Sequence, residues 1–172
     1  MNWTDSSGVR FEKPSPYWLK YKHKKFDNGE RIKIDTKSVY ETTRYGHDGS
    51  SYNLVARFFP NGQMLIFQED YSKIPIENQI NDSLAGKPGY YAVEGDKIKF
   101  QVWRNIFGDQ TPDTYGLILN DSTLKIYNTH IPDCKGPFNT GMTVYECLES
   151  KQDFNILKKT DKYELKNYNP NW

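Results

Sequence analysis

The chain has 172 residues, with 23 Lys and Arg against 22 Asp and Glu, so its formal net charge is +1. This length predicts one domain with a sizeable core, and the balanced charge excludes a general attraction to nucleic acid or to an acidic membrane surface. Aromatic residues make up 15% of the chain, which favours half-buried β-sheet over helical bundles. We expect an all-β protein.

The N-terminal residues differ from the rest of the chain. Residues 1–16 are polar and contain two prolines, which predicts an arm ahead of a single domain at residues 17–172. The chain does not begin like a secretory signal, and no apolar run reaches the roughly 18 to 20 residues of a membrane span. We expect a soluble chain without a transmembrane span. The mature form of an exported protein would look the same, so the compartment stays open.

Residues 17–35 predict a β-hairpin that turns at Asn28-Gly29. One face of this hairpin is basic and framed by aromatic rings, and its candidate partner-binding residues are Trp18, Lys20, Lys22, Lys24, Arg31 and Lys33. Such a face suits phosphate, a nucleic-acid backbone or an acidic partner, but a solvated surface whose lysines protect an edge strand is the favoured interpretation. Nucleic acid is not an expected partner, because the rest of the chain is balanced in charge.

A short strand is predicted at residues 38–45, and a second hairpin at residues 52–69 turns at Asn61-Gly62. A two-residue turn there gives one face without charge, formed by Leu54, Ala56, Phe58, Leu65 and Phe67. The opposite face is also largely apolar and includes Phe59 and Met64. If exposed, these two residues mark a partner surface. If the arm or the tail covers them, they belong to a second core.

Residues 70–88 form the longest connection, and a short helix is expected within residues 76–84, after Pro75. The connection is either a strap across one end of a barrel or a plain surface excursion.

Two further hairpins follow within residues 89–128. Gly95-Asp96 closes the first, and period-two alternation gives it a core face of Tyr91, Val93, Ile98, Phe100 and Val102. The second turns at Asn120-Asp121 or Asp121-Ser122, and either turn predicts a shared face of Tyr115, Leu117, Leu119, Leu124 and Ile126.

The C-terminal part has weaker patterns. We expect a loop at residues 129–141, a strand at 142–148, and then either a last hairpin or a short amphipathic helix at 154–168, of which the hairpin is favoured. Cys134 and Cys147 are the only cysteines. They form a disulfide in an exported protein, or two thiols in a reducing cytosol.

The elements add up to an antiparallel up-and-down meander of about eight to ten short strands, with at most one or two short helices, and closure into a barrel removes its exposed edges. The segments GYYAVEGDKIKF and YGLILNDSTLKIY resemble the central hairpins of small bacterial lipocalin-like proteins, many of them lipoproteins, over about 40 residues. The resemblance implies a calyx-like barrel in the cell envelope, in the periplasm or on the outer membrane. It also implies a lipid-bearing cysteine where Met1 stands here.

The lipocalin entry motif Gly-x-Trp is missing at Tyr17-Trp18, so no ligand-binding residue carries over from that family. Gly-x-Ser-x-Gly and glycine-rich phosphate loops are also missing. The histidines His23, His47 and His130 lie in poor contexts for acid-base chemistry, and two cysteines are too few for a metal site. We expect no enzyme activity, no cofactor and no metal.

A non-enzymatic module that binds a small apolar or amphipathic ligand is the expected function, because aromatic side chains recur on the predicted interior faces. The candidate ligand-binding residues are Tyr52, Phe58, Phe67, Tyr91, Phe100 and Tyr115. A filled core is an equally valid interpretation of the same pattern. The alternative function is a protein-interaction module, such as an inhibitor, an immunity protein or an envelope-assembly protein, that uses the basic hairpin or the apolar face with Phe59 and Met64.

Overall fold

A closed antiparallel β-barrel dominates the structure, a computed structural model that describes residues 2–4, 10–12, 34–45, 48–69, 75–82, 85–102, 113–128, 143–167 and 170. Eight strands pair in the order β10-β3-β4-β5-β6-β7-β8-β9. They are Val39–Tyr45 (β3), Ser51–Phe58 (β4), Gln63–Gln68 (β5), Lys87–Glu94 (β6), Lys97–Val102 (β7), Thr114–Asn120 (β8), Thr123–Tyr127 (β9) and Phe154–Thr160 (β10). The predicted all-β barrel is confirmed.

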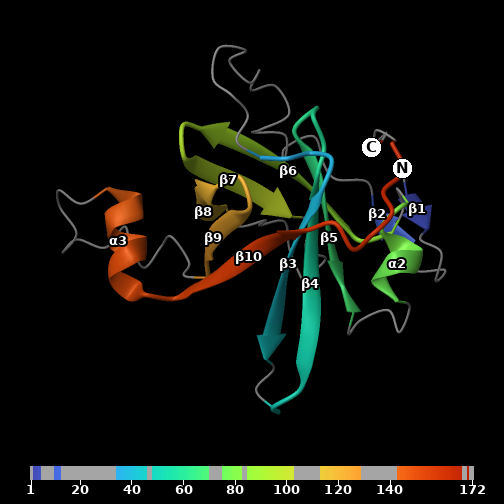
Figure 1. Cartoon of the computed structure of the whole chain (residues 1–172), viewed down its shortest axis with the longest axis horizontal. Coiled ribbons are helices and arrows are strands. Elements are labelled where there is room, and N and C mark those ends of the chain that lie inside the picture. Colours follow the sequence, from blue (N-terminus) through green and yellow to red (C-terminus); the bar gives the residue numbers. More distant parts are fainter. Residues whose placement is uncertain are drawn as a thin grey trace.

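The strands follow each other around the barrel in chain order, and β10 closes the circle by pairing with both β9 and β3. The described residues include two helices, Ile76–Gln79 (α2) and Val144–Lys151 (α3). Figure 1 shows them on opposite sides of the barrel, with β10 running between them. Two short strands, Asn2–Thr4 (β1) and Arg10–Glu12 (β2), pair with each other in a separate sheet and lie within the predicted arm.

Alternation along each strand sorts the side chains into an interior and an exterior set. Tyr91 lies opposite Phe100, and Val93 lies opposite Ile98, on the interior face of the β6-β7 hairpin. The predicted core face of this hairpin is therefore confirmed. Gly95 has a φ of 61°, which glycine adopts without steric cost in a tight turn.

The β4-β5 hairpin differs from its prediction by one residue. The backbone N–H of Phe59 donates to the carbonyl of Gln63 at 2.9 Å, so the loop contains Pro60, Asn61 and Gly62 rather than two residues. A shift of one residue moves every side chain of β5 to the other face. The placement of Phe67 on the interior face is therefore wrong. Met64 and Ile66 face the interior, whereas Leu65 and Phe67 face outward.

The β8-β9 hairpin also departs from its prediction. The register shifts between Ile118 and Asn120, where a β-bulge adds one residue to β8. Ile118 consequently lies opposite Leu124, and Leu117 lies opposite Lys125. The prediction that Tyr115 and Leu117 face the interior is therefore wrong, because the bulge reverses the face of β8 before the turn.

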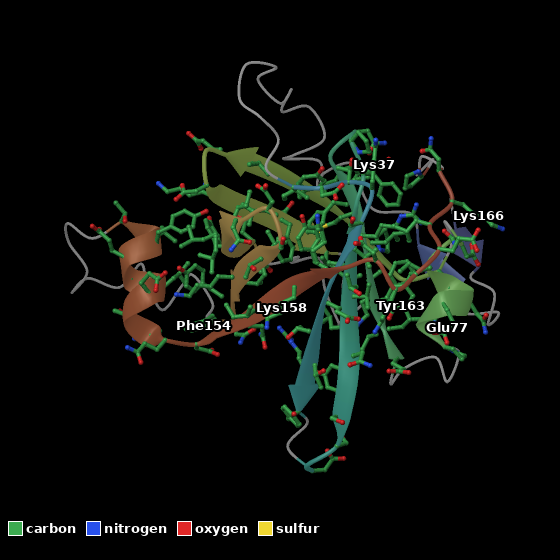
Figure 2. All side chains as sticks on the ribbon, in the orientation of Figure 1. Lys37, Glu77, Phe154, Lys158, Tyr163 and Lys166 are labelled. Carbon is green, nitrogen blue, oxygen red and sulfur yellow. The ribbon has the colours of Figure 1, made fainter. Side chains whose placement is uncertain are left out.

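A second core covers the outer face of β3, β4 and β5. We call it the α2 cluster, and its buried members are Val39, Val55, Phe59, Leu65, Phe67, Ile76, Ile80 and Ala85, with Tyr163 and Leu165 packed against them. Figure 2 shows Tyr163 beside α2, where the segment after β10 crosses the barrel. Phe59 is buried here and Met64 is buried inside the barrel. Of the two alternatives for these residues, the exposed partner surface is therefore wrong, and Phe59 belongs to a second core.

The strand predicted at residues 142–148 is wrong, because Val144–Lys151 forms α3. The Thr143 side chain accepts a hydrogen bond from the Glu146 backbone, and the Glu146 carboxylate accepts one from the Thr143 backbone at 2.7 Å. This capping box satisfies two N–H groups that a helix start would leave unpaired. The segment after β10, residues 161–167, contains no strand, so the predicted last hairpin is also wrong.

The helix α3 covers the outer face of β8 and β9, where Cys147 and Leu148 pack with Tyr127. Tyr115 and Tyr145 add an edge-to-face ring contact at 5.7 Å between centroids. Cys147 is disulfide-bonded, and the only other cysteine of the chain is Cys134, which lies outside the described residues.

Glu149 of α3 binds two side chains of β9, since Lys125 Nζ donates to Glu149 Oε2 at 2.6 Å and the Tyr127 hydroxyl donates to Oε1. The hydrogen bond from Lys125, followed by that from Tyr127, lowers the pKa of the Glu149 carboxyl. Because the pKa is lower in the folded state, this stabilisation is present above the unfolded pKa of about 4.3 and is lost as the pH falls through the folded pKa.

Replacing Glu149 with Gln is therefore expected to reduce the loss of stability on acidification, by less than about 1 kcal/mol because the carboxylate is partly exposed. Urea denaturation at pH 7 and pH 3 measures this. Glu164→Gln is the control, since that carboxylate is exposed and makes no hydrogen bond among the described residues. Equal pH dependence in both variants would contradict the prediction.

Candidate ligand-binding cavity

The barrel interior holds an open cavity of about 710 Å³. This volume lies within the usual range for small-molecule sites, about 300 to 1,000 Å³. The deeper lining is apolar and consists of Leu54, Ala56, Phe58, Met64, Ile66, Phe100, Val102, Ile126 and Leu157. The choice between a filled core and a cavity, which the sequence left open, is resolved in favour of a cavity.

Three aromatic rings pack together inside the barrel, and one of them, Phe58, lines the cavity; we call these rings the floor. The Phe58 ring lies edge-on to Tyr91, with centroids 5.0 Å apart, and edge-on to Tyr40, with centroids 5.7 Å apart. All three side chains are buried and come from β3, β4 and β6. The rings pack at the end of the barrel next to the β4-β5 loop, where the Tyr91 hydroxyl reaches the Phe59 carbonyl.

Hydrogen bonds hold the two tyrosines of the floor. The Tyr91 hydroxyl donates to the Phe59 carbonyl at 2.8 Å, and the Tyr40 hydroxyl accepts from the Asp35 backbone N–H at 3.0 Å. Burial raises the pKa of both phenols. The hydroxyls therefore stay protonated near neutral pH, and the floor carries no charge.

The mouth of the cavity is polar, and Arg44 lies in one of its walls. Arg44 Nη2 donates to Asn128 Oδ1 at 2.9 Å, and the same oxygen accepts from Asn155 at 2.5 Å. Asn128 Nδ2 in turn donates to Asp153 Oδ1 at 2.9 Å. These four residues, which all line the cavity, form one hydrogen-bonded network across β3, β9 and β10.

The lining of the cavity also includes Gln68, Lys87 and Asp113. Lys87 lies opposite Ile66 in the sheet and therefore points to the interior face. The Asp113 carboxylate accepts a hydrogen bond from Gln101 Nε2 at 2.5 Å. Charged and amide groups thus surround the opening, while the depth of the cavity is apolar.

Two aromatic residues of the β3-β4 hairpin extend the mouth. Tyr45 ends β3 and Tyr52 lies near the start of β4, and both line the cavity. The Tyr45 side chain is 78% exposed. Figure 1 shows that this hairpin projects beyond the neighbouring strands, so it extends one wall of the mouth.

The predicted ligand-binding residues separate into three groups. Tyr52, Phe58 and Phe100 line the cavity. Tyr91 lies inside the barrel at the floor. Phe67 and Tyr115 lie on the outer face, in contact with the α2 cluster and with α3 respectively. The basic residues Trp18, Lys20, Lys22, Lys24, Arg31 and Lys33, and also His23, His47 and His130, lie outside the described residues.

The polar mouth was not predicted from the sequence. The strongest sequence signal for the polar mouth is Arg44, because Thr42 and Arg44 share one face of β3 with the buried Tyr40. A charged residue in phase with core positions indicates a solvated or functional site. The other face of this strand, with Glu41 and Thr43, also combines apolar and polar residues. The sequence therefore did not show which face of β3 points into the barrel.

Within the part of the chain that the structure describes, no group of three or more His, Cys, Asp or Glu is placed to hold a metal ion. None of the helices in that part has the length and apolar character needed to cross a membrane. No family model, curated protein or solved structure matches the chain. The cavity, with its apolar depth and polar mouth, is the candidate site.

Proposed function

We propose that this protein is a non-enzymatic, lipocalin-like binding module that holds one small amphipathic ligand in its barrel. The observation that supports the proposal is the division of the cavity lining: apolar side chains line its depth, and polar and charged side chains lie around its mouth. Burial of an apolar group in such a cavity contributes about 25 cal/mol per Å². The polar mouth keeps a hydrophilic end in contact with water.

Blocking the cavity tests the proposal. Ala56 is buried and lines the cavity between Phe58 and Leu54. Replacing Ala56 with Phe is expected to lower the affinity for the dye 8-anilino-1-naphthalenesulfonate at least about tenfold, because the new ring occupies the space of the ligand. Fluorescence titration measures the affinity, and circular dichroism verifies the fold.

Ala92→Phe is the matched control, since Ala92 lies opposite Lys99 on the outer face of β6 and does not line the cavity. This variant is expected to bind the dye as the unmodified protein does. Equal dye binding by Ala56→Phe and Ala92→Phe would contradict the proposal, because the dye would then occupy a surface outside the barrel.

A further inference from the structure

Arg44 is the charged side chain best placed to contact a ligand in the cavity. It lies opposite Tyr52 on the interior face near the end of β3, and it lines the mouth. Residues deeper in the same cavity, such as Phe58 and Phe100, are apolar. A ligand with its apolar part in the depth therefore places its polar end at the level of Arg44.

The guanidinium group of Arg44 is held in place but has unused donors. Its Nη2 donates to Asn128 Oδ1 at 2.9 Å, which is a neutral acceptor. Its Nε atom is buried and has no hydrogen-bond partner among the described residues. Since a guanidinium has five N–H donors in a fixed fork, the network orients Arg44 without using its capacity for a planar oxyanion.

The carboxylates of the mouth already accept hydrogen bonds from neutral amides. Asp113 accepts one from Gln101, and Asp153 accepts one from Asn128. Neither forms an ion pair with Arg44 among the described residues. The lining therefore combines two carboxylates, each hydrogen-bonded to a neutral amide, with a cation that retains free donors, and Lys87 adds a second positive charge.

We propose that the ligand carries a carboxylate, and that Arg44 binds it through its two terminal nitrogens, Nη1 and Nη2. A carboxylate matches the guanidinium fork with two parallel hydrogen bonds, and both are strengthened by charge. The ligand class is a monocarboxylate with an apolar chain or ring system, oriented with the chain toward the Tyr40-Phe58-Tyr91 floor. This inference rests on the proposed function, because it assumes that the cavity is the binding site.

Three probes with the same chain and different headgroups test the inference on the full chain: dodecanoate, dodecanol and dodecyltrimethylammonium, each below the concentration of micelle formation. Displacement of a bound fluorescent dye gives the three dissociation constants. Dodecanoate is expected to bind at least about tenfold more tightly than dodecanol, because it gains charge-assisted hydrogen bonds. The ammonium compound is expected to bind weakest.

Arg44→Gln is expected to weaken dodecanoate binding at least about tenfold and to leave dodecanol binding unchanged. Unchanged dodecanol binding also shows that the variant is folded with its cavity intact. Arg44→Lys keeps the charge but lacks the fork, so it is expected to recover only part of the affinity for dodecanoate. Lys158→Gln is the control for bulk charge, since Lys158 is exposed on the outer face of β10 (Figure 2).

The outcomes separate the two proposals. If no probe binds the unmodified protein, the proposed function is overturned, and the headgroup inference with it. If all probes bind but dodecanoate has no advantage, or if Arg44→Gln leaves its advantage unchanged, only the headgroup inference is overturned. Equal losses in Arg44→Gln and Lys158→Gln would likewise overturn it, because the effect would come from net charge.

Discussion

Replacing Phe58 with Ala is expected to destabilise the folded protein by about 3 to 5 kcal/mol, as is typical of large buried aromatic residues. The side chain is 1% exposed, and its ring contacts both Tyr40 and Tyr91. The loss includes the transfer free energy of the ring and the cost of the space left behind. Urea denaturation measures the free energy of unfolding.

Phe154→Ala is the matched control on the outer face of the barrel. This ring is 39% exposed and lies under the Lys125 ammonium, 4.2 Å from the ring centroid, so its removal is expected to cost less than about 1.5 kcal/mol. Figure 2 shows Phe154 at the end of β10 nearest α3. Similar losses for the two variants would show that the three-ring floor does not carry the stability assigned to it.

The existence and order of the strands were predictable because turn residues and period-two alternation are local properties of the chain. The Gly95-Asp96 hairpin shows this well, since only its interior face is apolar and a slip of one residue would bury Lys97 and Lys99. Closure of the barrel followed from the same pattern, because a meander of this length leaves two edges unless its ends pair.

The interior faces of β5 and β8 were not predictable, because the alternation of residues does not fix the register of either strand. The strand β5 is apolar on both sides, so hydrophobicity does not distinguish a two-residue loop from the three-residue loop that ends at Gly62. The bulge between Ile118 and Asn120 has no counterpart in the alternation of β8. Both errors moved aromatic residues, Phe67 and Tyr115, into the predicted site.

The candidate site was predictable in its apolar depth and not in its mouth. Aromatic residues on interior strands indicate a core or a cavity, and Phe58 and Phe100 belong to both. The mouth depends on which strand ends meet after closure, which brings Arg44 of β3 next to Asn128 and Asn155 near β9 and β10. Such a contact between residues more than 80 positions apart has no local signature in a single sequence.

Replacing Arg57 with Met is expected to destabilise the protein by about 3 kcal/mol or more, because a buried charged donor with several acceptors is lost. Arg57 points outward from β4 into the α2 cluster and is 4% exposed. Its Nη1 donates to the Ile80 carbonyl at 2.7 Å and to Asn81 Oδ1 at 3.1 Å, and its Nη2 donates to the Lys166 carbonyl at 2.5 Å.

Two variants make this measurement specific. Arg57→Lys retains the charge and the apolar stem but lacks the planar fork, so it is expected to recover only part of the loss. Arg44→Gln removes an arginine from the adjacent strand β3, where the side chain lines an open mouth, and is expected to cost less than about 1.5 kcal/mol. If the effects at positions 57 and 44 are equal, the three carbonyl and amide contacts of Arg57 contribute little.

The region that loses stability in Arg57→Met is as informative as the size of the loss, because Arg57 joins the barrel to α2 and to the segment after β10. Asn81 completes the connection by donating to the Glu164 carbonyl at 2.7 Å and accepting from the Lys166 backbone. In Arg57→Met, hydrogen exchange is therefore expected to accelerate first at residues 76–82 and 161–167, while the cavity strands keep their protection. Uniform acceleration across the barrel would instead show that the α2 cluster and the barrel interior unfold as one unit.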